Sequence, residues 1–407
     1  MLRRIRKTVG RILVGFLLLL VAVVLISALS NLGLSGSSRV VDRLDDDEKA
    51  LIAEAIHLRK NLGEEIWPGW EVAEIPVLVY NESFAFLVGL EQPADGWYKP
   101  PRGPQRGAAW ELVPGDNFYG QPYYRQSLPN AEITPEAFTV KVGDHWVASF
   151  PTKEWLEISL RQQMQSDLPS FLRPLVPYRL VLRLFLKGSD GYMAGLLHES
   201  FHAFQGLVAP GRLNTAELSA NEQADRYPFQ DEAMVTTWQA DLDVLVAALQ
   251  AANREERAAM AAQFLSQRDN RRKQLSISPA QQDFERQREW LEGLARYAEL
   301  GVWRVGGNAE TYLPLAAAEQ LSDYSVFAAH IRRWSEELDT MVRMADDPGD
   351  GRFYYSGMAQ AMLLDSLLPG WKERAFQLGV FLEDLLRASL VEYSGYLSSE
   401  GLVVIIT

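Results

Sequence analysis

The 407-residue sequence contains no cysteine. Disulfide bonds, thiolate metal sites, cysteine nucleophiles and lipid attachment through an N-terminal cysteine are therefore excluded. Histidine is also scarce, with five residues in the whole chain. Any metal site built on imidazole must draw on these few positions, so two of them at ligand spacing are informative.

Basic residues are in the minority, with 40 Lys and Arg against 53 Asp and Glu and a formal net charge of −13. Five of the bases lie in residues 3–11, so the rest of the chain has 35 bases against 53 acids, a net charge of −18. A body this acidic repels phosphate backbones, and no basic stripe with interleaved aromatics reverses the argument. We therefore expect no nucleic-acid partner.

Several other signals are missing from the sequence. It has no glycine-rich phosphate loop, no G-x-S-x-G nucleophile elbow and no internal repeat. With 47% apolar and 23% charged residues, the composition is that of an ordinary globular protein. At this length we expect one large elaborated domain, or an anchor followed by two lobes.

An uncharged apolar run over residues 12–29 follows the N-terminal basic cluster and is long enough to cross a bilayer. Positive charge on the short N-terminal flank predicts a cytoplasmic N-terminus and an extracytoplasmic body. A cleaved signal peptide is the alternative, because the small residues near Ser30 loosely resemble a cleavage site, and the body would then be secreted. We expect a single-pass protein anchored in the lipid bilayer through residues 1–34.

The remaining chain predicts an α+β fold, with a β-containing lobe over residues 35–177 and a mainly helical domain over residues 178–407. The first lobe should contain an amphipathic helix, two short strands, and a hairpin that turns at Gly143 and Asp144. Aromatic residues between positions 90 and 130 should pack on its sheet. The second should begin with a strand over residues 178–186. Helices should follow over roughly 192–206, 231–267, 280–300, 324–345, 356–368 and 371–397.

The strongest motif is the H-E-x-x-H string of His198, Glu199 and His202. Histidines four residues apart project from one helix face, so both imidazoles can bind one metal ion, and zinc suits such a pair. Glu199 lies about 100° around the helix from His198 and can act as a general base toward a water on the open side of the metal. The alternative is two histidines satisfied by hydrogen bonds on a half-buried helix.

A catalytic zinc site needs a third protein ligand, and two glutamates are candidates. Glu222 follows His202 by 20 residues, a separation that resembles thermolysin-like enzymes, although Asp225 follows it at three positions instead of four. Glu292 lies in the string W-L-E-G-L-A-R-Y-A-E, which resembles the third-ligand helix of gluzincins of the one-zinc aminopeptidase type. Gly293 would let another backbone or a substrate approach, and Glu299 could orient a ligand histidine. We favour Glu292 over Glu222; the alternative for Glu292 is an ordinary exposed helix acid.

The two strings together resemble the gluzincin superfamily of zinc metallopeptidases, most specifically bacterial members with an HExxH helix and a distant E-G-[LI]-A-x-Y-x-E helix. The resemblance covers residues 178–368, about half of the chain. It implies a zincin-like fold, one Zn²⁺ ion held by His198, His202 and Glu292, and Glu199 as the general base.

Tyr354 begins a Tyr-x-x-Gly step that resembles the oxyanion donor of aminopeptidase-type gluzincins, with Ser356 where lysine is usual. Tyr355 and Tyr227 are alternatives for this donor. No G-x-M-E-N string for gripping a free amino terminus is present, so exopeptidase action is not supported.

We therefore predict a membrane-anchored, zinc-dependent, metalloprotease-like hydrolase that cleaves a peptide or protein substrate in the cell envelope. One alternative is a cell-envelope binding or assembly module with a structural or inactive metal site. Another is zinc-dependent hydrolysis of a non-peptide amide or ester. Three protein ligands and an open position would favour an enzyme, whereas four protein ligands would favour the scaffold.

Overall fold

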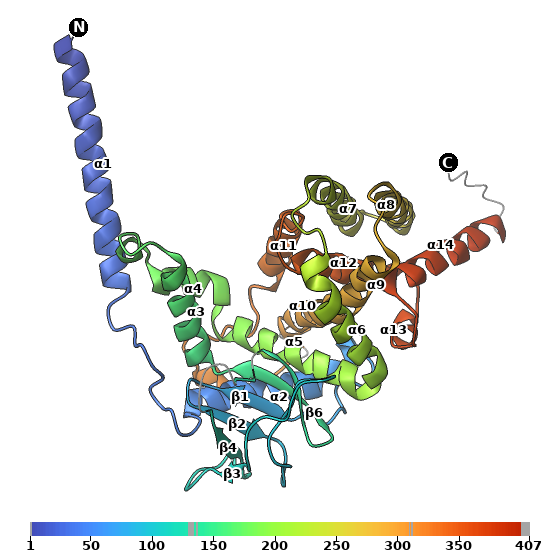
Figure 1. The fold of residues 1–407 in the computed structure, drawn as a ribbon, viewed down its shortest axis with the longest axis horizontal. Coiled ribbons are helices and arrows are strands. Elements are labelled where there is room, and N and C mark those ends of the chain that lie inside the picture. Colours follow the sequence, from blue (N-terminus) through green and yellow to red (C-terminus); the bar gives the residue numbers. More distant parts are fainter. Residues whose placement is uncertain (1, 129–133, 136, 309, 311, 400–407) are drawn as a thin grey trace.

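The computed structural model describes residues 2–128, 134–135, 137–308, 310 and 312–399, without the side chains of residues 2–13, 20, 138 and 393–399. It is a mixed α+β structure, as predicted, in which the helices lie on one side of a single sheet (Figure 1). The elements are α1 (Leu2–Ser30), α2 (Asp46–Ile66), β1 (Val77–Tyr80), β2 (Phe84–Val88), β3 (Glu111–Leu112), β4 (Tyr124–Ser127), β5 (Phe138–Val142), β6 (His145–Pro151), α3 (Lys153–Asp167), η2 (Arg173–Leu175), α4 (Tyr178–Leu186), α5 (Gly188–Val208), α6 (Pro210–Gln223), η3 (Ala224–Arg226), α7 (Glu232–Gln250), α8 (Arg254–Gln274), α9 (Pro279–Arg288), η4 (Glu289–Gly293), α10 (Leu294–Gly306), η5 (Ala318–Gln320), α11 (His330–Met341), α12 (Gly351–Leu367), α13 (Trp371–Ala375) and α14 (Leu382–Ser399).

The sheet has the strand order β3-β4-β2-β1-β6-β5, and its pairs are antiparallel except for the parallel pair β1–β6. The predicted hairpin is confirmed as β5 and β6, and its turn uses Gly143 at φ +58°. Alternate side chains of β1 point to opposite faces: Val79 joins the main core and Leu78 a second cluster. Trp97 and Trp110 cover this second face, so aromatics of the 90–130 segment pack on the sheet as expected.

Helix α5 lies between the sheet and the helical layer. On one side it contacts β6, and a Cβ atom at Gly195 would meet the ring of Phe150 at 2.9 Å. The small residue therefore allows the helix to approach the strand closely. On its other sides α5 contacts α2 and α10. The main core cluster includes Trp67, Phe201 and Trp371, so it contains residues of both predicted lobes.

The predicted strand over residues 178–186 is wrong, because this segment forms the helix α4. A short apolar run of this length fits either structure, and its leucines and arginines are good helix formers with Val181 as the sole β-branched residue. The predicted helix over residues 231–267 is divided at Asn253, whose side chain caps α8. The helix predicted from residue 324 begins at His330 instead.

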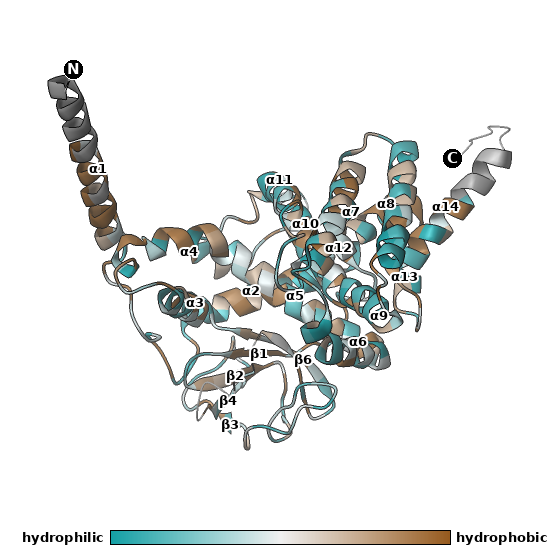
Figure 2. Cartoon of the chain, turned by 45° about the horizontal axis from the view of Figure 1, so that its top comes forward, coloured by the Kyte–Doolittle hydropathy of each residue, from teal (hydrophilic) through white to brown (hydrophobic). Residues whose placement is uncertain are grey.

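Helix α1 extends away from the rest of the chain, and Figure 2 shows its apolar character. Its described apolar side chains are largely exposed, among them Leu18 and Leu29 at 64% and 66%. Judged on the described residues, none of the helices combines the length and the apolar character that a bilayer span requires.

Candidate metal centre

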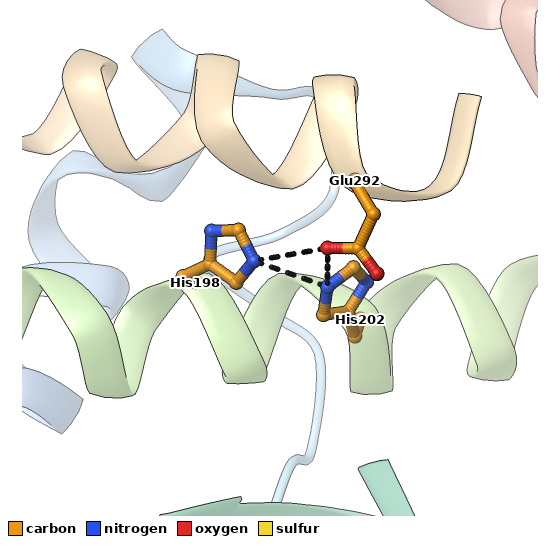
Figure 3. Close-up of side chains that lie close together, drawn as sticks. All are labelled: His198, His202 and Glu292. Atoms are coloured by element: carbon orange, nitrogen blue, oxygen red, sulfur yellow. Dashed lines mark hydrogen bonds and ion pairs between the residues drawn. The ribbon is translucent and has the colours of Figure 1, made fainter. Parts of the chain in front are cut away.

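Three buried side chains converge between α5 and η4 (Figure 3). His198 and His202 lie one turn apart on α5, and their Nε2 atoms are 3.2 Å apart. Glu292, on η4, places its Oε2 atom 3.2 Å from His202 Nε2 and 3.5 Å from His198 Nε2. The three residues therefore form a group that could hold a metal ion.

The spacing of these donor atoms fits a small tetrahedral cation. Ligands that lie about 2.0 to 2.1 Å from a tetrahedral zinc ion are about 3.3 to 3.4 Å from one another. The observed separations of 3.2, 3.2 and 3.5 Å bracket this value. Two imidazole nitrogens and one carboxylate oxygen are also a ligand set that zinc prefers.

The third donor sits on a π-helical segment. η4 interrupts the path from α9 into α10, and such single-turn π segments are often found at functional sites. A Cβ atom at Gly293 would lie 2.5 Å from the Gly357 Cα atom of α12, so only glycine allows this approach. The backbone contact predicted beside Glu292 is thus present, and it holds η4 against α12.

Buried polar contacts fix η4 from its other end. The Glu289 carboxylate accepts hydrogen bonds from Arg268 on α8 and from the Ser356 hydroxyl on α12. Arg268 is fully buried and also donates to Glu383 on α14. Moving Glu289 away from these partners would leave a buried charge uncompensated, which would strongly destabilise the folded protein. The network therefore restricts the position of the segment that carries Glu292.

The second nitrogen of each histidine lies near a side chain that can orient the ring, through a hydrogen bond for His202 and an ion-pair contact for His198. His202 Nδ1 lies 2.8 Å from Gln205 Oε1, while Gln205 Nε2 donates to the carbonyl of Trp290 at 3.0 Å. His198 Nδ1 lies 3.4 Å from Glu299 Oε2, as the sequence suggested for Glu299. Both Nε2 atoms therefore face the point where the three side chains converge and where a metal ion could be held.

The carboxylates of Glu292, Glu299 and Glu199 favour positive charge at the centre of the group, and Arg288 orients one of them. Arg288 donates to Glu292 Oε1 at 2.8 Å, which leaves Oε2 to face the histidines. Burial alone would raise the pKa of Glu292, but Arg288 and His202 outweigh it and hold the pKa well below its usual value. Burial lowers the pKa of His198, yet Glu292 and Glu299 raise it to about 10. The site thus stabilises positive charge where the imidazoles and carboxylates meet.

Glu199 is buried beside the group, with 8% of its surface exposed. Its Oε2 atom has no hydrogen-bond partner among the described protein residues. Burial raises the pKa of this carboxyl, the two histidines lower it, and the net pKa is above its ordinary value. Such a group is suited to accept and release a proton.

Tyr354 lies next to the three converging side chains. Its ring stacks on that of His198, with centroids 5.9 Å apart and planes inclined by 8°. Burial raises the pKa of its hydroxyl well above the usual value, and Glu292 raises it further, so the hydroxyl keeps its proton and can donate. Tyr355 accepts from Arg296, and the Tyr227 hydroxyl donates to Glu285 in the core.

Glu222 lies exposed near the end of α6 and does not belong to the converging group. Two residues in contact with the ligands were missed by the sequence reasoning. Arg288 precedes Glu292 by four residues and Gln205 follows His202 by three, so helical spacing alone could have indicated both.

Comparison of the chain with known protein families, with curated proteins and with solved structures gives no match. Function is therefore argued from the site itself.

Proposed function

We propose that this chain is a membrane-anchored, single-zinc hydrolase of the gluzincin type, with a zincin-like fold, that cleaves peptide bonds. The observation that carries the proposal is the convergence of His198, His202 and Glu292, with donor-atom separations that suit a tetrahedral ion. A sequence motif alone could arise by chance. A chance motif would not be expected to lie against the carboxylate of a glutamate 90 residues away on another helix, as His202 does here.

A zinc ion held there would polarise a substrate carbonyl and make a water molecule easier to deprotonate. Glu199 would take the proton from that water and pass it to the leaving amine. Tyr354 would donate a hydrogen bond to the oxygen that becomes negative in the transition state. Arg288 would hold Glu292 in place throughout, since it binds the carboxylate oxygen that faces away from the histidines.

The arrangement supports an enzyme over a structural metal site. The converging group consists of three protein ligands within the described residues, and catalytic zinc sites use three ligands and keep one position open. The Glu199 Oε2 atom, buried beside the group without a hydrogen-bond partner among the described residues, supports the proposed role as general base. Peptide hydrolysis and hydrolysis of another amide or ester require the same groups, so only substrate assays separate them.

We place the body of the protein outside the cytoplasm, with residues 12–29 in the lipid bilayer and a peptide or protein of the cell envelope as substrate. The uncharged run and the basic residues before it support this location. Protease added to intact cells should degrade the body. A body that survives until the cells are lysed would contradict this orientation.

The catalytic proposal is tested with Glu199→Gln, compared with the exposed control Glu222→Gln. Glu199→Gln should keep zinc, because the three ligands remain, while hydrolysis of a peptide mixture falls by at least about 100-fold. The control should retain both. Metal analysis and peptide mass spectrometry measure the two properties, and undiminished turnover by Glu199→Gln would refute the role.

A further inference from the structure

Helix α4 exposes an apolar strip that nothing in the described protein covers. The strip consists of Leu180 and Leu184, one turn apart on the helix, and of Phe185 at its C-terminal end; these side chains are 46%, 76% and 76% exposed. Tyr178 and Leu182, also one turn apart, are buried. α4 is therefore attached to the body through these two residues and still presents three large apolar side chains to the outside.

The strip lies close to the C-terminal end of α1. The Ser27 hydroxyl and the Asn31 side chain there donate to the carbonyl of Val176, two residues before α4. Arg179 donates to the carbonyl of Leu32, which is itself 64% exposed. Figures 1 and 2 both show α4 beside the lower end of α1, so the strip is held near the end of the proposed anchor.

A basic strip borders the apolar one. Arg179 and Arg183 are four residues apart, so they share one side of α4, and both are exposed. Arg173, in η2, is exposed as well. Exposed arginines beside large apolar side chains are typical of helices that lie in the headgroup region of a membrane, with the guanidinium groups among the phosphates.

We propose that α4 is a second membrane contact, which inserts Leu180, Leu184 and Phe185 into the bilayer surface beside the α1 anchor. The proposal rests on the membrane-anchor part of the proposed function and is independent of its hydrolase chemistry. α5 begins at Gly188, directly after α4, so this contact would also hold the metal helix at a constant orientation to the bilayer. Substrates would then be met close to the membrane surface.

The absence of cysteine allows a direct test on the full chain, because a single introduced cysteine is the sole labelling site. Leu184→Cys and Phe185→Cys receive an environment-sensitive fluorophore, and the protein is reconstituted in phosphatidylcholine–phosphatidylglycerol vesicles. Leu378→Cys is the matched control, since Leu378 is 81% exposed and lies between α13 and α14. Leu18→Cys reports on the anchor itself.

Labels at 184 and 185 should be quenched by a lipid-soluble quencher and protected from aqueous iodide, and the label at 378 should behave in the opposite way. If the label at 18 is quenched from the lipid but those at 184 and 185 are open to iodide, this inference is wrong and the anchor stands. If the label at 18 is also open to iodide, α1 is not in the bilayer, and the membrane anchor of the proposed function is refuted together with this inference. Protection at 184 and 185 that appears only at high protein density, without lipid quenching, would indicate a second copy of the chain and overturn the proposal.

Discussion

Replacing Gly293 by alanine should disturb both the stability and the metal affinity of the protein. The added Cβ atom would lie 2.5 Å from the Gly357 Cα atom and 2.9 Å from the Met358 nitrogen, and neither backbone atom can move alone. Since carbon atoms pack at about 3.5 to 4.0 Å, η4 and α12 would have to separate by about 1 Å. Overpacking of this kind costs about 1 to 3 kcal/mol, against which the helix propensity of alanine returns about 1 kcal/mol.

We therefore expect Gly293→Ala to lower the free energy of unfolding by up to about 2 kcal/mol, measured by urea denaturation of the metal-free protein. The same shift would move Glu292 by more than the roughly 0.2 Å that metal–ligand distances tolerate, so zinc should bind about 10- to 100-fold more weakly.

Gly211→Ala is the matched control for this change. Gly211 is also in a helix, but a Cβ atom there would meet nothing within 4 Å. This variant should be unchanged or more stable by about 0.5 to 1 kcal/mol, with wild-type zinc affinity. If Gly293→Ala behaves like Gly211→Ala in both measurements, the close packing of η4 on α12 does not position the third ligand.

Three further changes have defined outcomes. Tyr354→Phe should reduce kcat by about 100- to 1,000-fold with zinc content unchanged, while Tyr355→Phe should keep most of the activity. Equal losses of activity in the two variants would show that Tyr354 is not the specific hydrogen-bond donor. Gln205→Leu should weaken zinc binding about 10-fold or more in a chelator competition, because it frees the second nitrogen of His202, and unaltered affinity would argue against this positioning role. Burial raises the pKa of Glu48 to about 7, so its stabilising protonated form is complete below the unfolded pKa of about 4.5 and is lost as the pH rises through 7. Glu48→Gln should remove a decline of up to about 3 kcal/mol in unfolding free energy between about pH 4.5 and pH 7, and identical pH profiles of the two proteins would contradict the shift.

The metal group could be anticipated from sequence because much of its geometry is local. The spacing of His198 and His202 by one helical turn determines that both imidazoles share a face, wherever the helix lies. The choice between Glu222 and Glu292 is of another kind, since it depends on which distant helix packs against α5. Sequence spacing carries no such information, and the preference for Glu292 came from the resemblance of the string around it to the third-ligand helix of gluzincins.

Tertiary packing decided the features that sequence reasoning did not predict. α4 has a short apolar run whose length fits a strand or a helix, although its leucines and arginines favour the helix, and it packs against α3 and α5. The π-helical turn η4 is held in place through Glu289, which meets Arg268 and Ser356 from two other helices. Hydropathy periodicity cannot reveal a constraint of that kind.

Zinc binding by the full chain and its Glu292→Gln variant tests the central claim most directly. Competition with a chromophoric chelator should give one zinc ion per wild-type chain, the same for Glu222→Gln, and an affinity lower by more than about 100-fold for Glu292→Gln. A folded wild-type protein that binds no zinc, or a Glu292→Gln variant that binds it as tightly as wild type, would contradict the proposed metal centre.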